Sequence, residues 1–162
     1  MCKKKFETII KQKLFNPLGM RQTSFATLDA PAPNPSMGAS STANEYLNFL
    51  CMLINNGVYN GIKVLREEAI KEMRTIQTQE GQIKSEPKAA EGMPYTLGSW
   101  AVETNGKEAN ASTSSGLLGP IAIVDWCRGY AFVLFSKALQ NEQRKEPCVE
   151  MAEAVNDRLH SK

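Results

Sequence analysis

The C-terminal half of the chain contains three runs rich in β-branched, aromatic and other apolar residues, with turn-forming residues between them. The runs cover residues 95–102, 120–126 and 129–136. Successive runs of this kind are typical of antiparallel strands joined by turns. They predict a β meander over residues 94–137. A final helix is expected at 147–160, because proline is favoured in a first helical turn and apolar residues recur at helical spacing after Pro147.

Residues 1–77 are predicted to be mainly helical. In the segment 3–15, apolar side chains recur at steps of three and four residues. Pro17 then ends this helix, because the residue before a proline avoids the helical backbone conformation. A further, charged helix is expected at 66–77.

Between these two helices the sequence predicts another one, of about fifteen residues. Ser41 or Thr42 has the side chain needed to cap its first turn, and Glu45 follows Thr42 at the spacing of a capping-box acid. Asn56 and Gly57 should end the helix, because both tolerate the left-handed backbone conformation.

Two stretches lack a regular pattern. Residues 29–38 hold three prolines within five positions, which excludes a helix or a central strand, and residues 78–93 are polar and predict a long loop. The chain has 162 residues, the length of one ordinary domain. Helices followed by strands predict a single α+β domain over 1–162. It would have an antiparallel sheet of about three or more strands and the C-terminal helix packed on it.

Charge and cysteine content exclude several function classes. The basic run from Lys3 to Lys5 is more typical of a solvated helix face than of a nucleic-acid-binding arm. The four cysteines form no Cys-x-x-Cys pair and His160 is the sole histidine, so no metal site is predicted. Buried free thiols are expected at Cys51 and Cys127, although a disulfide stays open. The sequence predicts neither a transmembrane span nor a secretory signal.

Two passages resemble the penicillin-recognising serine hydrolases, the superfamily of serine β-lactamases and DD-peptidases. Residues 15–25 (FNPLGMRQTSF) are similar to the PLGM-x-x-T-x-F passage of the class C β-lactamase-like branch. Residues 34–46 (NPSMGASSTANEY) are similar to the helix entry GG-x-x-STA-x-D that follows it. Shorter matches continue in family order from residue 6 to residue 137. The resemblance implies a partial serine β-lactamase-like fold.

The resemblance also implies which residues the chemistry needs. Such enzymes acylate a serine of a Ser-x-x-Lys motif and use a Tyr-x-Asn motif in proton transfer, and both motifs precede the PLGM passage. No catalytic residue is therefore expected in this chain. Formal copies occur at 85–88 (SEPK) and 46–48 (YLN), but the first lies in a polar loop and Tyr46 belongs to an apolar helix stripe. We interpret both as chance matches. The family implies neither a cofactor nor a metal.

A third family motif, Lys/His-x-Gly on a strand, helps to bind the substrate carboxylate and forms part of the oxyanion site. The matching segment, 112–119, places Ser114 where lysine or histidine is usual, Ser115 at the middle position and Gly116 at the required glycine. These three are the predicted substrate-binding residues. Ser114 brings no positive charge, but its hydroxyl can still hydrogen-bond a carboxylate. A polar turn with no ligand is the competing interpretation.

The resemblance predicts the C-terminal segment of a hydrolase acting on β-lactams, peptidoglycan peptides or small esters. It would be inactive alone and would take substrate only with an N-terminal segment. The alternatives are a non-catalytic peptide- or partner-binding module and a truncated reading frame or fragment. Bare strand edges would favour self-association, and no nucleic-acid partner is predicted. Relatives are often periplasmic or otherwise extracytoplasmic in bacteria, but the chain itself indicates no location.

Overall fold

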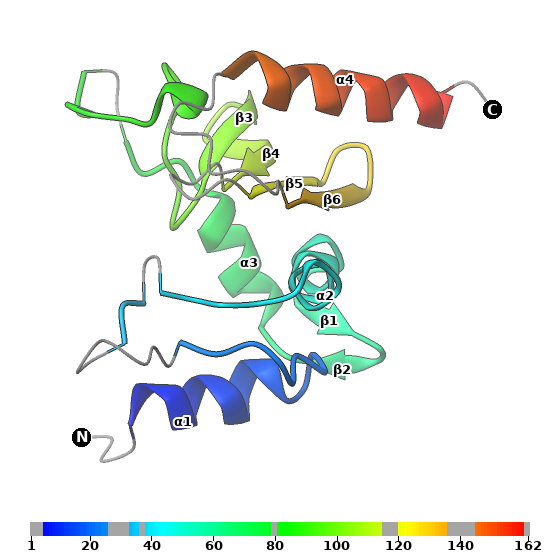
Figure 1. Ribbon diagram of the computed structural model, residues 1–162. Coiled ribbons are helices and arrows are strands. Elements are labelled where there is room, and N and C mark those ends of the chain that lie inside the picture. Colours follow the sequence, from blue (N-terminus) through cyan, green and yellow to red (C-terminus); the bar gives the residue numbers. More distant parts are fainter. Residues whose placement is uncertain are drawn as a thin grey trace. The chain divides into compact units, whose positions relative to one another are not determined.

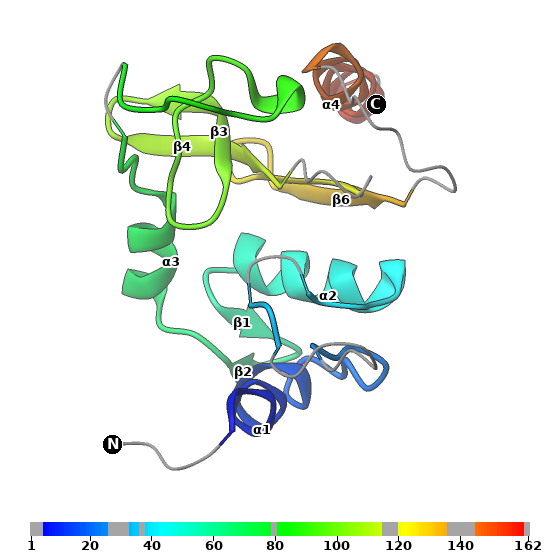
Figure 2. The same cartoon turned by 60° about the vertical axis from the view of Figure 1, so that its left-hand side comes forward.

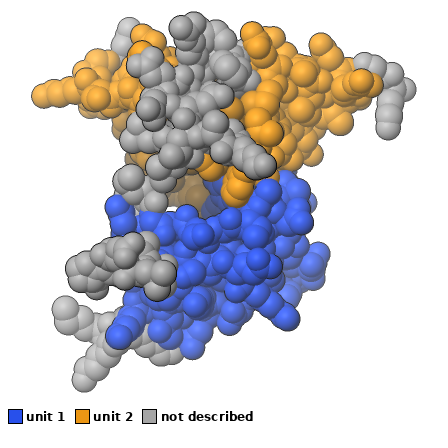
Figure 3. All heavy atoms as spheres, viewed as in Figure 1, with its two compact units in different colours: residues 1–67 blue, residues 68–162 orange. Residues whose placement is uncertain are grey.

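The computed structural model describes residues 5–25, 33–35, 38–78, 81–114, 120–135 and 145–160. Its elements belong to two compact units, residues 1–67 and residues 68–162, and each unit is considered by itself (Figures 1, 2 and 3). Whether the units form the single domain expected from the sequence stays a prediction.

The first unit begins with a helix that ends in the PLGM passage. Helix α1 (Phe6–Ile10) continues as a π-helical segment, Lys11–Phe15, so the predicted helix is confirmed over these residues. Leu18 is fully buried, and Gly19 has a φ of 69°, a left-handed conformation that suits glycine. Met20 N–H then donates to the carbonyl of Phe15 at 2.8 Å, which closes the helix end. The passage is therefore a helix terminus folded into the core.

Helix α2 (Ala43–Ile54) has the cap that the sequence predicts. The side-chain oxygen of Thr42 accepts a hydrogen bond from the backbone N–H of Glu45 at 3.2 Å. The second half of the predicted capping box is wrong. The carboxylate of Glu45 instead accepts from the backbone N–H of Gln22 at 2.9 Å and from the hydroxyl of Thr23 at 2.6 Å. Glu45 therefore ties α2 to the segment that follows the PLGM passage.

The end of α2 leads into a short hairpin. Asn56 and Gly57 have φ values of 51° and 90°, which confirms the predicted left-handed helix end. Strands β1 (Val58–Tyr59) and β2 (Ile62–Lys63) then pair antiparallel. Of the proline-rich stretch 29–38, residues 29–32, 36 and 37 lie outside the described residues. Within its described part, Gly38 N–H donates to the carbonyl of Asn34 at 2.8 Å and closes a tight turn.

The second unit contains helix α3, a four-stranded sheet and helix α4. Helix α3 covers Glu67–Arg74 and confirms the charged helix. All neighbouring strands are antiparallel, in the order β3-β4-β5-β6. The strands are β3 (Trp100–Asn105), β4 (Glu108–Thr113), β5 (Ile121–Asp125) and β6 (Tyr130–Leu134).

Helix α4 (Lys145–His160) lies along one face of this sheet (Figures 1 and 2). Ile121 and Ile123 of β5 form a buried cluster against which Met151 and Ala152 of α4 pack. The predicted α+β fold with a C-terminal helix on an antiparallel sheet is thus confirmed.

The sheet differs from the prediction at its start. Residues 95–99 form a turn, in which the Thr96 hydroxyl donates to the carbonyl of Ser99 at 3.0 Å, and the strand begins only at Trp100. Strand β4 was not predicted, because its sequence, EANAST, is rich in residue types that are depleted in strands. Residues 79 and 80 of the polar stretch 78–93 lie outside the described residues, and its described part is irregular apart from a short 3₁₀ helix at Lys88–Ala90.

Cys51 and Cys127 are free thiols, but Cys51 is half-buried and Cys127 is exposed. The expectation that both are buried is therefore wrong. Cys127 is exposed because it lies in the turn that joins β5 to β6. Cys2 and the side chain of Cys148 lie outside the described part of the chain. No described helix is long and apolar enough to cross a membrane.

Candidate functional site

The candidate substrate-binding segment follows directly on strand β4. Ser114 is exposed, and its backbone N–H donates to the carbonyl of Ala122 in β5 at 3.1 Å, so the pairing of the two strands extends to this residue. Ser115 and Gly116 lie outside the described residues. The structure therefore places one of the three predicted site residues, at the end of an inner strand of the sheet. A substrate-binding role for the three stays a prediction.

Alternation along β4 determines which side chains share a face of the sheet. Thr113 pairs with Ile123, which packs under α4, so Thr113 belongs to the helix-covered face. Ser112 and Ser114 therefore belong to the opposite face. A substrate that approached this face at the end of β4 would meet the exposed Ser114, which brings a hydroxyl group and no positive charge.

The two hydroxyls next to each other in β4 have different surroundings. The hydroxyl of Thr113 donates to the carbonyl of Ala122 at 3.0 Å. The hydroxyl of Ser112 is buried and has no hydrogen-bond partner among the described residues. Buried hydroxyls are normally paired, so Ser112 is an unsatisfied polar group beside the candidate site. Sequence reasoning missed it, because the burial of Ser112 depends on the unpredicted strand β4.

The formal copies of the two upstream motifs do not form a catalytic arrangement. Ser85 is exposed in the polar loop and precedes a 3₁₀ helix of three residues, rather than opening an α-helix. Tyr46 stacks on Phe49 with ring centroids 6.2 Å apart. Asn48 donates from its side-chain amide to the carbonyl of Leu18 at 3.0 Å. These contacts give Tyr46 and Asn48 roles in packing the first unit.

The polar loop lines an open cavity of about 350 Å³ in the second unit. The side chain of Glu86 lines it and accepts a hydrogen bond from the backbone N–H of Gly92 at 3.2 Å. The remaining lining residues are small, apolar or hydroxylated: Thr78, Gly81, Ile83, Gly92, Met93 and Pro94. Among the described residues that line it, the cavity has one carboxylate and no nucleophile–base pair, so these residues offer no acyl-transfer chemistry.

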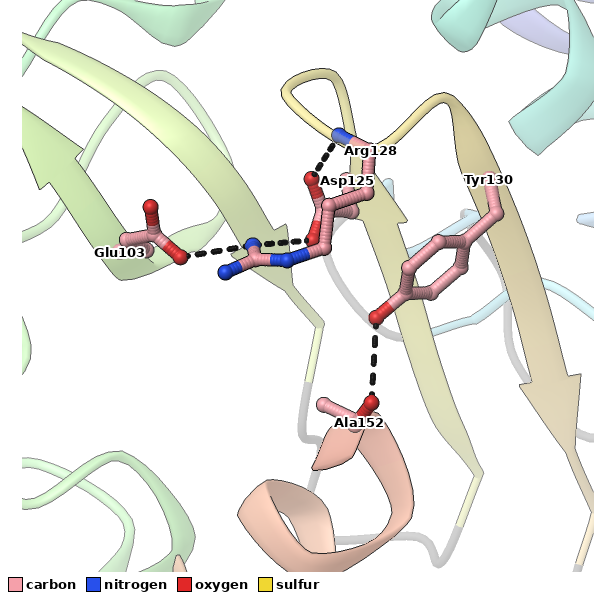
Figure 4. A network of polar contacts seen from close by, with 5 residues as sticks. All are labelled: Glu103, Asp125, Arg128, Tyr130 and Ala152. Atoms are coloured by element: carbon pink, nitrogen blue, oxygen red, sulfur yellow. Dashed lines mark hydrogen bonds and ion pairs between the residues drawn. The ribbon is translucent and has the colours of Figure 1, made fainter. Parts of the chain in front are cut away.

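A polar network surrounds the buried end of β5 (Figure 4). Asp125 accepts from the backbone N–H of Arg128 at 2.8 Å and from its guanidinium at 2.9 Å. The same guanidinium group donates to Glu103 of β3 at 2.8 Å. Tyr130, whose hydroxyl donates to the carbonyl of Ala152 at 3.4 Å, lies beside this group. The Arg128 contacts link β3 to the β5–β6 turn, and the Tyr130 hydrogen bond links β6 to α4.

Charge pairing explains the electrostatics of this network. The hydrogen bond from Arg128 lowers the pKa of Glu103, and the bonds to Glu103 and Asp125 raise the pKa of Arg128. Burial, followed by the charge of Asp125, raises the pKa of the Tyr130 hydroxyl. Glu103 and Arg128 thus each favour the charged form of the other. The arrangement therefore stabilises the sheet and offers neither a free base nor a nucleophile.

No three His, Cys, Asp or Glu side chains gather to hold a metal ion in the described ranges.

Comparison with known proteins adds the family. The family model described as beta-lactamase matches residues 2–155. The fold is similar to a protein from Bacteroides dorei DSM 17855 that is provisionally designated a beta-lactamase, with a TM-score of 0.74 and 23% identity over 94% of this chain and 52% of that one. No curated protein matches the chain.

Two further solved structures show the same fold. A penicillin-binding protein homologue from Caulobacter crescentus has a TM-score of 0.60 and 17% identity, over 86% of this chain and 47% of that one. A provisionally designated 6-aminohexanoate-dimer hydrolase from Bacillus anthracis has a TM-score of 0.67 and 20% identity, over 93% of this chain and 37% of that one. The chain thus spans about half or less of each of these three proteins.

Proposed function

The chain belongs to the beta-lactamase family, and from that premise we propose that it forms the C-terminal part of a serine hydrolase active site. The observation that carries the proposal is the position of Ser114. It lies at the end of inner strand β4, on the sheet face opposite α4, where the family's third motif is expected. In this role the chain supplies one wall of the site, and a segment that precedes it in the family pattern supplies the nucleophile.

The Ser114 hydroxyl acts as a hydrogen-bond donor to the carboxylate or carbonyl of the substrate. It replaces the cation that the family usually has at this position, so it binds an anionic substrate without the attraction of a full positive charge. The substrate class is a β-lactam, a peptidoglycan peptide or a small ester. The serine that is acylated lies outside this chain, because Ser85 is in a loop and has no base placed by a helix turn.

The first test is acylation of the chain as it stands. We expect intact-mass spectrometry to find no covalent adduct after incubation with a fluorescent penicillin or with p-nitrophenyl acetate. Ser85→Ala is the matched variant. An adduct on the unmodified chain that is lost in Ser85→Ala would show that the loop serine is a nucleophile, and the proposal would then be wrong.

The second test uses the coding sequence upstream of Met1. An in-frame Ser-x-x-Lys followed by Tyr-x-Asn is the expected finding, and an upstream reading frame without either motif contradicts the proposal. With such a segment attached, Ser114→Ala should raise KM for a carboxylate-bearing substrate and change kcat less. Ser114→Lys should lower that KM by restoring the positive charge. Ser85→Ala serves as the control and should leave both constants unchanged.

A further inference from the structure

Three asparagines of the chain are followed directly by glycine: Asn56, Asn60 and Asn105. Such a pair is chemically labile, because glycine has no side chain to shield its backbone nitrogen from the side-chain amide before it. When that nitrogen attacks the amide carbon, a succinimide ring forms and ammonia leaves. Water then opens the ring to aspartate or isoaspartate. The local backbone determines which of the three glycine nitrogens reaches its asparagine.

Ring closure requires a particular rotation of the asparagine backbone. The side chain and the attacking nitrogen must lie on the same side of the bond between the α-carbon and the carbonyl carbon. This places ψ at about −120°, the value at the first central residue of a type II′ turn. At the same position of a type I′ turn ψ is about +30°, so the nitrogen points away from the side chain. The peptide of a type I′ turn must therefore turn over before the ring can close.

Asn60 and Gly61 are the two loop residues of the hairpin between β1 and β2 (Figures 1 and 2). Their φ values of 47° and 77° identify a type I′ turn. Both residues are exposed, and a β-carbon at Gly61 would meet no atom within 4 Å. The peptide between them lies outside both strands, and glycine accepts a φ of either sign. It can therefore turn over while the pairing of Tyr59 with Ile62 is kept.

The peptide that follows Asn56 is held in place. Its N–H belongs to Gly57 and donates to the carbonyl of Met52 at 2.9 Å, at the end of α2. Gly57 is buried, and a β-carbon there would lie 2.4 Å from the carbonyl oxygen of Leu65. The attacking nitrogen is thus engaged in a hydrogen bond and has no room to turn over.

Asn105 is exposed like Asn60, so exposure alone does not distinguish these two sites. However, Asn105 is the last residue of β3 and pairs with Glu108 of β4. The rotation that closes the ring would move the carbonyl of Asn105 out of this pairing. Reaction at Asn105 therefore requires the end of the hairpin to open first.

We propose that Asn60 is the deamidation site of the folded chain. The nitrogen of Gly61 forms a bond to the side-chain carbon of Asn60, the bond from that carbon to the amide nitrogen breaks, and the Gly61 proton leaves with ammonia. Water consumed in opening the ring supplies the oxygen of the new carboxylate. The product carries a negative charge at the hairpin tip, and isoaspartate also lengthens the backbone of the turn. The proposal does not rest on the hydrolase function, which concerns β4.

The test is tandem mass spectrometry of peptides from the full chain after incubation at mildly alkaline pH. Digestion at acidic pH prevents further deamidation during handling. We expect Asn60 to be converted at least about fivefold faster than Asn56 or Asn105, because each of the other two must first lose a backbone hydrogen bond. The same chain unfolded in urea is the matched control. There the three rates should converge, because the backbone no longer distinguishes the sites.

Gly61→Asn tests the role of the attacking nitrogen. Asparagine tolerates a positive φ, so the turn is kept, but its β-carbon crowds the nitrogen. Conversion of Asn60 should fall several-fold, conversion of Asn105 should stay unchanged, and thermal unfolding checks the fold of the variant. An Asn60 that stays intact in the folded, unmodified chain overturns the proposal. Conversion of Asn56 or Asn105 at the same rate as Asn60, or faster, also overturns it, whether or not the variant folds.

Discussion

The hydroxyl of Thr23 donates a hydrogen bond to the carboxylate of Glu45 at 2.6 Å, across 22 positions of sequence. Both side chains are buried. The Thr23 oxygen also lies 2.7 Å from the hydroxyl of Ser41. The resemblance to family passages at 15–25 and 34–46 thus has a physical basis: one buried carboxylate connects the two passages.

The Glu45 carboxylate should make the stability of the chain depend on pH. Burial acts to raise its pKa, but the Thr23 hydroxyl and the backbone N–H groups of residues 21–23 lower the pKa below the usual value of 4.5. A carboxyl with a lowered pKa stabilises the folded state above its unfolded-state pKa. This contribution is lost as the pH falls through the folded-state pKa.

We therefore expect Glu45→Gln to be less stable than the unmodified chain at pH 7, with the difference shrinking as the pH falls below 4.5. Urea unfolding at a series of pH values measures this. Glu72→Gln, at an exposed position of α3, is the control and should follow the unmodified chain. A constant difference between Glu45→Gln and the unmodified chain at all pH values would exclude the carboxylate charge as the cause.

Gly57 and Gly61 should respond differently to alanine. Both have positive φ values, 90° and 77°, so a side chain strains either position. At Gly57 a β-carbon would also lie 2.4 Å from the carbonyl oxygen of Leu65, whereas at Gly61 it would meet no atom within 4 Å. Gly61→Ala should cost roughly 1 kcal/mol of unfolding free energy, and Gly57→Ala clearly more. Chemical denaturation compares them, and equal losses would contradict the close approach at Gly57.

The sequence predicted the elements whose bounds are determined by residues close together along the chain. Helix α2 has its cap at Thr42 and its left-handed end at Asn56, and both follow from local chemistry. Strand β4 was missed, because its small and polar residues become buried only through pairing with β3 and β5 on either side. Likewise, the spacing of Glu45 fits a capping box, yet a partner distant in sequence captures its carboxylate.

The sequence indicates where the candidate segment lies along the chain, and its substrate-binding role stays a prediction. Ser114 was located by its order relative to the family motifs, and it does lie at a strand end. The burial of the Ser112 hydroxyl and the ion pair between Arg128 and Glu103 depend on how the strands pair. Such contacts between residues far apart in sequence leave no periodic signal along the chain.

Neighbouring residues in β4 should respond differently to the loss of their hydroxyl groups. Ser112→Ala removes a buried hydroxyl that has no partner, so it should leave stability unchanged or raise it by up to about 1 kcal/mol. Thr113→Val removes the hydrogen bond to the Ala122 carbonyl and should lower stability by about 1 kcal/mol. Thermal and urea unfolding measure both. A loss of stability in Ser112→Ala would show that its hydroxyl is paired in solution.

Arg128 should be the most sensitive member of the network in Figure 4. Its guanidinium lies 2.9 Å from the carboxylate of Asp125, which is 2% exposed, and 2.8 Å from that of Glu103, whose side chain is 41% exposed. Arg128→Leu leaves the buried Asp125 carboxylate with the backbone N–H as its remaining partner in this network. Because the loss of a hydrogen bond to a buried charge is strongly destabilising, we expect Arg128→Leu to lower the free energy of unfolding by about 2 kcal/mol.

Glu103→Gln provides the matched comparison, because it keeps an oxygen acceptor near Arg128 and removes only an exposed charge. We expect Glu103→Gln to lower the free energy of unfolding by less than about 1 kcal/mol, as for other solvent-exposed ion pairs. Urea unfolding in low and high salt separates the two variants. Salt screens exposed charges, so the small effect of Glu103→Gln should shrink with added salt, while the loss in Arg128→Leu persists. If Glu103→Gln were as damaging as Arg128→Leu, the buried Asp125 contact would not be the source of stability.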